Sequence, residues 1–175
     1  MKYVLSIAAV IFSSISYAQE GWEKTIVTPG VSVSFPAKPA QTEIAKGQLS
    51  FIFKQPDSTT NYMVAVSDLQ LLAGLDAATL EAAMEKDETW EQAKTSFITS
   101  MGEGASLVKD EMITIQNTRA LKLVVNRKNG KGEMNVLTVV IFVKDVNSVN
   151  VIFNSRNGKG AEKNKDQFLN SIEIK

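Results

Sequence analysis

One stretch of the chain, Val136–Val143, is apolar at every position except Thr138. Side chains of a β-strand alternate between its two faces, so a strand of this composition is buried on both of them. Such a strand belongs in the middle of a sheet, and other elements must cover both faces of that sheet. No other feature of the 175-residue sequence restricts the possible folds as strongly.

The segments around this stretch either alternate between apolar and polar residues or run apolar between turn residues, as strands do. They predict strands over residues 31–35, 49–54, 62–69, 106–116, 119–127, 133–144 and 148–154. Tight turns separate the last four of these strands, and a hairpin loop joins the second to the third. Because a parallel pair needs a long crossover, we expect antiparallel pairing.

Two helices are also expected. Asp76 is a suitable N-cap for a helix over residues 77–101, which Gly102 ends. An apolar stripe predicts a second helix over residues 161–172, followed by an extended tail. Together these elements predict an α+β fold, in which helices flank both faces of an antiparallel β-sheet as an α/β/α sandwich.

The first predicted helix is strongly acidic. Charged residues interrupt its apolar face, so we expect a kink or a second helix start near Asp87. Paired carboxylates can perform acid–base chemistry, but a run of acids is more often the solvent-facing side of a helix. The acids concerned are Glu81, Glu85, Asp87, Glu88 and Glu91.

The first 18 residues have the pattern of a signal peptide. Lys2 supplies a positive start, residues 3–15 are mostly apolar, and Ser16 and Ala18 are the small residues that a signal peptidase reads. We expect cleavage after Ala18, a secreted or periplasmic protein, and one domain over residues 19–175. No other segment is apolar enough to cross a membrane, so none is expected after cleavage.

The sequence contains neither cysteine nor histidine. Disulfides, thiol nucleophiles, thiolate metal sites and imidazole-dependent triads are therefore excluded. The commonest ligands of zinc are also missing. We expect no catalytic centre, no cofactor and no metal site. Lysine plus arginine and aspartate plus glutamate number 19 each, so the net charge is zero, and we expect no nucleic-acid partner.

Three segments carry a resemblance to a known family: residues 33–39 (VSFPAKP), 62–69 (YMVAVSDL) and 167–172 (QFLNSI). Together with the strand pattern, they resemble the PsbP-like fold, which is shared by photosystem extrinsic proteins, a Ran-binding nuclear import factor and many secreted bacterial proteins. The resemblance implies an α/β/α sandwich that works mainly by binding other proteins. It implies no common catalytic centre, so no active-site residue is transferred to this chain.

Two basic, glycine-containing loops are the best candidate site. In an antiparallel meander every second loop lies at the same end of the sheet, so the loop after residue 126 and the loop after residue 154 should cluster. With backbone amides and a helix N-terminus beside them, they would form an anion site. The candidate ligand-binding residues are Arg127, Lys128, Asn129, Gly130, Lys131, Arg156, Asn157, Gly158 and Lys159.

The charge is unevenly distributed along the chain. Residues 19–118 carry 7 basic and 14 acidic side chains, a net −7, whereas residues 119–175 carry 11 basic and 5 acidic side chains, a net +6. If the fold keeps these segments apart, the protein has two oppositely charged lobes, which favour association with a charged partner.

These observations lead to three functional hypotheses. The first is a non-enzymatic secreted or periplasmic protein that binds another envelope or secreted protein. The second is a protein that binds a small anionic ligand or lipid headgroup through the basic loops. The third is a hydrolase that uses the helix carboxylates.

Overall fold

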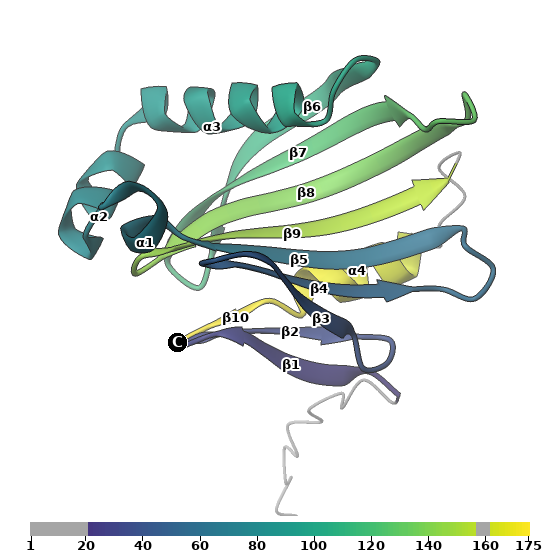
Figure 1. Ribbon diagram of the computed structural model, residues 1–175, viewed down its shortest axis with the longest axis horizontal. Helices are drawn as coiled ribbons and strands as arrows, with labels where there is room; N and C mark the ends of the chain where they lie inside the picture. The colour runs from purple at the N-terminus through teal and green to yellow at the C-terminus, as the bar shows by residue number, and fades with distance from the viewer. Residues whose placement is uncertain (1–20, 157–161) are drawn as a thin grey trace, which may run out of the picture.

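The computed structural model describes residues 21–156 and 162–175 (Figure 1). The predicted signal peptide and three of the candidate site residues, Asn157, Gly158 and Lys159, lie outside this range. The strands are β1 (Glu23–Thr28), β2 (Val31–Phe35), β3 (Ala40–Ala45), β4 (Gln48–Lys54), β5 (Thr60–Asp68), β6 (Ala105–Ile115), β7 (Thr118–Lys128), β8 (Met134–Lys144), β9 (Asn147–Arg156) and β10 (Glu173–Ile174). The helices are α1 (Leu69–Ala73), α2 (Ala77–Met84), α3 (Asp87–Ser100) and α4 (Glu162–Asn170).

Seven strands form one sheet in the order β3-β4-β5-β9-β8-β7-β6, and all neighbouring strands are antiparallel. The expected meander of the last four strands is present as β6 to β9. The strand rich in apolar residues is β8, which pairs with β7 on one side and β9 on the other. Its side chains at 139 and 140 point to opposite faces and are both buried, so the sheet is covered on both sides as expected.

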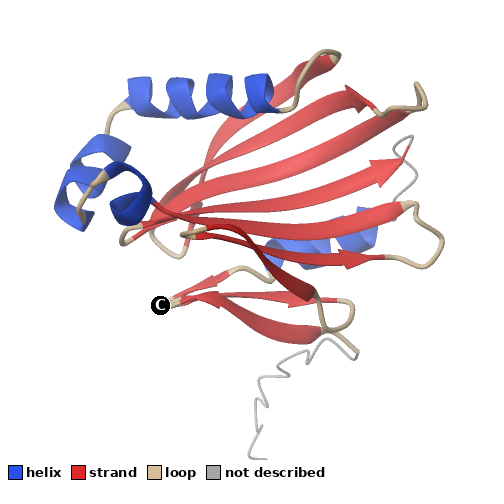
Figure 2. Ribbon diagram, in the orientation of Figure 1, coloured by secondary structure: helices blue, strands red, loops and turns tan. Residues whose placement is uncertain are grey.

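The first face of the sheet packs against a small sheet of order β1-β2-β10 and against helix α4 (Figure 2). Its core is aromatic: Phe168 of α4 contacts Phe35 of β2 and Tyr62 of β5, with ring centroids 5.4 and 5.2 Å apart. Tyr62 also meets Phe153 edge to face at 5.4 Å. These three contacts join the small sheet, the helix and the central sheet into one cluster.

The second face packs against α3, which runs along β6 and β7 in Figure 1. Trp90 is the buried anchor of this helix, and Met84, Phe97 and Met101 are half-buried beside it. They cover an aliphatic surface on the strands, which consists of Leu121, Leu123, Val125, Leu137, Val139, Ile141 and Ile152. The α+β class with an antiparallel sheet is therefore confirmed. The layer on the first face is largely a second sheet, which the sequence did not predict.

The expected break in the long helix lies at Glu85 and Lys86, between α2 and α3. Two side chains satisfy the carbonyls that the break leaves without helical partners. The Trp90 indole donates to the Met84 carbonyl at 2.7 Å, and Arg119 donates to the carbonyls of Met84 and Glu85 at 3.2 and 2.8 Å. The break thus turns the apolar face of α3 toward the sheet, while its charged residues remain outside.

Strands β1 and β3 and helix α1 were not expected from the sequence. The residues of β3 are all exposed because it lies at the sheet edge, so no alternation reveals it. The turn before β4 depends on Gly47, whose φ is +79° and whose position would put a Cβ 2.8 Å from the Leu71 side chain of α1. The positive φ favours glycine at this turn, and a larger residue would also displace the exposed Leu71 side chain.

Candidate functional site

The structure brings the described part of the two basic loops to one end of the central sheet. Arg127 and Lys128 end β7, Lys131 lies in the following turn, and Arg156 ends β9. Arg127 pairs with Asn135 of β8, and Asn135 pairs with Arg156. Directly paired residues point to the same face, so both arginines share a face at two strand spacings, about 10 Å apart. We call Arg127, Lys128, Lys131 and Arg156 the basic sheet end.

The turn after β7 uses some of the backbone amides that were expected to bind an anion. It spans residues 129–133, and the Asn129 amide oxygen accepts from the backbone amides of Lys131 and Glu133 at 2.9 and 3.0 Å. The Gly132 amide donates to the Asn129 carbonyl. These amides already donate hydrogen bonds within the turn, so they are not the exposed anion-binding donors that we expected. Asn129 holds the loop in shape instead of binding a ligand.

Glu133 lies within this group and reduces its positive charge. Its carboxylate accepts from the Asn129 side-chain amide at 2.8 Å and lies 3.4 Å from Nε of Arg156. Arg156 is therefore partly neutralised. By contrast, Arg127, Lys128 and Lys131 are exposed and form no ion pair within the described residues.

An apolar side chain accompanies these cations. Met134, the first residue of β8, pairs directly with Lys128 and is 37% exposed. Met134 therefore places an exposed thioether beside Lys128, whereas Arg127 points to the opposite face of the sheet.

The two charged lobes expected from the sequence are not formed. In the sheet order, β7, β8 and β9 belong to the basic second part of the sequence. They lie between β5 and β6, which belong to the acidic first part. Cross-strand and helix contacts then mix the two halves, as in the ion pairs Lys122–Glu111 at 3.4 Å and Arg119–Asp87 at 2.8 Å. The unpaired positive charge is consequently a local property of the sheet end.

Beside the basic sheet end is a small cavity of about 60 Å³ that the sequence did not reveal. Every residue that lines it is polar: Ser58, Thr59, Asn61, Asn129, Asn135, Asn154 and Arg156. The amide oxygens of Asn135 and Asn154 are buried and have no hydrogen-bond partner among the described residues. The one sequence signal was Asn135, which stands between the apolar residues Met134 and Val136 of a strand.

A turn acid lies near this cavity. The backbone amide of Thr59 and then its hydroxyl donate to Asp57, at 3.0 and 2.8 Å. These hydrogen bonds hold the pKa of the Asp57 carboxyl below its usual value. Asp57 therefore stays ionised but turned toward its own loop.

A larger groove of about 280 Å³ lies at the opposite end of the sheet, between α2 and the turns after β6 and β8. Glu81, Glu85, Lys144 and Asp145 line it together with Arg119. Arg119 is already bound to the two carbonyls of the helix break and to Asp87. Its guanidinium thus has a structural role.

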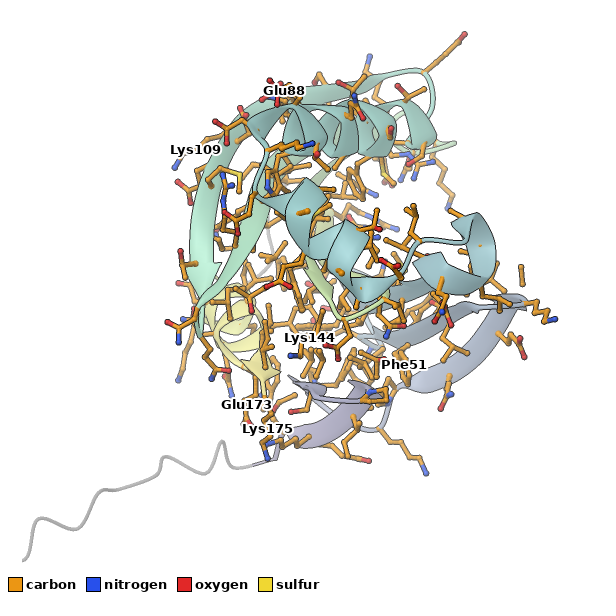
Figure 3. The ribbon with its side chains drawn as sticks, turned by 90° about the vertical axis from the view of Figure 1, so that its left-hand side faces the viewer. Phe51, Glu88, Lys109, Lys144, Glu173 and Lys175 are labelled. Carbon is orange, nitrogen blue, oxygen red and sulfur yellow. The ribbon has the colours of Figure 1, made fainter. Side chains whose placement is uncertain are left out.

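The acids of the predicted hydrolase alternative are all exposed. Asp87 pairs with Arg119, and Glu91 pairs with Lys94 at 2.7 Å. Figure 3 shows Glu88 on the outer surface of α3. This arrangement differs from the desolvated carboxylate pair that acid–base catalysis uses.

Within residues 21–156 and 162–175, no three acidic side chains lie close enough together to share a metal ion. None of the helices in this range has the length and apolarity needed to span a bilayer.

The chain is similar to known proteins in its structure. No family model matches the chain, and no curated protein matches it by sequence. A cyanobacterial PsbP from Synechocystis superposes with a TM-score of 0.56 at 13% identity, over 89% of this chain and 93% of that one. A Pseudomonas aeruginosa protein of unknown function, described as a candidate regulator, gives 0.56 at 14% identity, over 88% and 97%.

A crystal structure from Bacteroides thetaiotaomicron matches at 19% identity with a TM-score of 0.49. It covers 87% of this chain, which spans about half, 48%, of that protein. The likenesses to the Synechocystis and Pseudomonas proteins are those of a shared fold. The chain has a PsbP-like fold, as its sequence resemblance indicated.

Proposed function

We propose that this protein is exported, is not an enzyme, and binds a partner protein whose acidic side chains dock on the basic sheet end. The observation that supports this best is the set of exposed cations Arg127, Lys128 and Lys131, which have no ion pair in the described part of the chain. Clustered, unpaired charge accelerates encounter with a complementary surface and orients it.

Met134 gives this surface an apolar contact beside the charges. Charge alone selects any polyanion, whereas a partner protein can also cover an exposed thioether. The combination therefore favours a protein over inorganic phosphate as the main occupant.

Export is proposed from the pattern of the first 18 residues, with cleavage after Ala18. We also propose the finer description of the fold, a PsbP-like α/β/α sandwich, in which α3 and α4 are the helical layers. Mass spectrometry of the protein recovered from its host's envelope tests the cleavage site. A mature chain that begins elsewhere than Gln19 contradicts it.

Chemical cross-linking in the native envelope, followed by affinity purification, tests the partner. We expect one acidic protein to be recovered repeatedly, and we expect the double variant Lys128→Glu/Lys131→Glu to lose it. The matched control is Lys46→Glu/Lys86→Glu, which changes two other exposed lysines by the same total charge. Recovery that is unchanged in the first variant, or lost equally in both, refutes the proposed surface.

A further inference from the structure

The polar cavity beside the basic sheet end has a composition that suits a particular ligand chemistry. Asn135 lies on β8 between Arg127 and Arg156, and Asn154 lies on β9 opposite Asn61 of β5. The three asparagines therefore share one face of the sheet, on a diagonal across three adjacent strands.

The amides of Asn135 and Asn154 are the most unusual feature of this cavity. Their oxygens are buried and accept no hydrogen bond within the described residues. A buried acceptor without a donor is costly, so the cavity favours a group that brings O–H or N–H donors. A cavity with two unsatisfied acceptor oxygens therefore prefers a ligand with hydrogen-bond donors over a ligand that has acceptors alone.

The charge beside the cavity limits the kind of donor. Arg156 lines the cavity and Arg127 lies on the same face, so an ammonium group or a metal ion would be repelled. The nearby carboxylates do not reverse this preference, because Glu133 pairs with Arg156 and Asp57 binds its own loop. A neutral hydroxyl attached to an anionic group meets both requirements.

The volume of about 60 Å³ accommodates only part of such a molecule. It is small beside the several hundred Å³ of a typical ligand pocket, so a hydroxyl-bearing carbon enters while the rest remains outside. The anionic group then lies near the exposed guanidinium of Arg127 and the ammonium of Lys131.

From this geometry we infer that the cavity lined by Asn61, Asn135, Asn154 and Arg156 binds a small hydroxylated anion. Its hydroxyls donate to the two asparagine oxygens, and its carboxylate or phosphate lies beside Arg127 and Lys131. This inference goes beyond the proposed function, because it concerns a small ligand in the cavity and requires no partner protein.

Isothermal titration calorimetry of the purified protein tests the ligand class. The probes are glucuronate and glycerol 1-phosphate, which combine hydroxyls with a charge, and acetate, inorganic phosphate and glucose, which have only one of the two. We expect at least one hydroxylated anion to bind tenfold or more tightly than its simpler counterparts. Preference for glucuronate or for glycerol 1-phosphate identifies a carboxylate or a phosphate source, and equal affinity for all five probes overturns the inference.

Two variants test the residues. Asn135→Leu and Asn154→Leu should each weaken the favoured probe tenfold or more and leave the melting temperature unchanged or higher, since they remove an unsatisfied acceptor. Asn150→Leu is the matched control, because Asn150 lies on the same strand and face as Asn154 but outside the cavity. Variants that raise the melting temperature without changing affinity mean that the amides hold only water, and they refute the inference.

A second measurement needs no variant. In the unaltered protein, the side-chain amide NMR signals of Asn135 and Asn154 should shift as the favoured probe is added, with those of Asn150 unchanged. Loss of the partner protein in the envelope experiment leaves this result unaffected, so the two proposals fail separately.

Discussion

The two faces of the central sheet are covered in different ways. The first face carries a layer of strands and a helix that meet it through fully buried aromatic rings, with Phe35, Tyr62 and Phe168 each 0% exposed. The second face carries α3, whose only buried side chain is Trp90. The end of this second face, near Arg127 and Arg156, is polar and includes the asparagine cavity. The fully buried aromatic rings are therefore on one face, and the asparagine cavity lies on the other.

This difference has a physical basis. Aromatic rings packed edge to face exclude water and fix the relative position of three elements. A helix held by one indole and a few half-buried side chains covers less apolar area, so it leaves polar strand positions open beside it. The polar strand positions that remain open on the second face are those that line the asparagine cavity.

The largest effect that tests this comparison is expected for Phe168→Ala. Phe168 fills the aromatic core between the small sheet and the central sheet, so its removal leaves a cavity and should cost about 4 kcal/mol in unfolding free energy. Phe97→Ala on the second face should cost less than half as much, because Phe97 is only half-buried. Urea denaturation measures both, and equal losses would contradict the stated difference between the faces.

A smaller effect is expected for Trp90→Phe. This variant keeps an aromatic ring under α3 but removes the indole hydrogen bond to the Met84 carbonyl, at about 1–2 kcal/mol. Trp22→Phe on the first face is the control, since the Trp22 indole makes no hydrogen bond in the described part of the structure and should lose less than about 1 kcal/mol. An unfolding free energy that is unchanged in Trp90→Phe would show that the helix break does not depend on this hydrogen bond.

The smallest effect is a pH dependence on the first face. Burial raises the pKa of the Tyr62 hydroxyl above its usual 10.0. Ionisation is then easier in the unfolded chain, so the stability contributed by neutral Tyr62 is complete below pH 10 and is lost as the pH rises through the folded pKa. The absorbance difference at alkaline pH between the protein and Tyr62→Phe isolates this group, and ionisation below its usual value would show that the core admits water.

Several features were predictable because they depend on local order in the sequence. The alternation in β7 and β9 and the continuous apolar run in β8 identify the meander, since strand periodicity is a property of neighbouring residues. The charges of Asp87, Glu91 and Lys94 on an otherwise apolar helix face indicated the break for the same reason. By contrast, β3 has no buried side chain and pairs only at the sheet edge, so its sequence contains no strand signal.

The candidate site was predictable in part. Loop alternation correctly placed Arg127, Lys128 and Lys131 at the same sheet end as Arg156. The use of Asn129 to bind its own turn, and the pairing of Glu133 with Arg156, depend on side-chain geometry that residue order does not specify. Asn135 and Asn154 come from the consecutive strands β8 and β9, but Asn61 comes from β5, far earlier in the sequence, and nothing within any one strand links the three.

The sequence by itself determined which strands alternate, where the long helix breaks, and that cysteine and histidine chemistry is absent. These properties follow from composition and from periodicity over a few residues. Only the tertiary structure decided that a second sheet covers one face, that the two charged halves interleave, and that three asparagines meet beside two arginines. Those outcomes depend on strand order and register, because pairing joins residues that are distant along the chain.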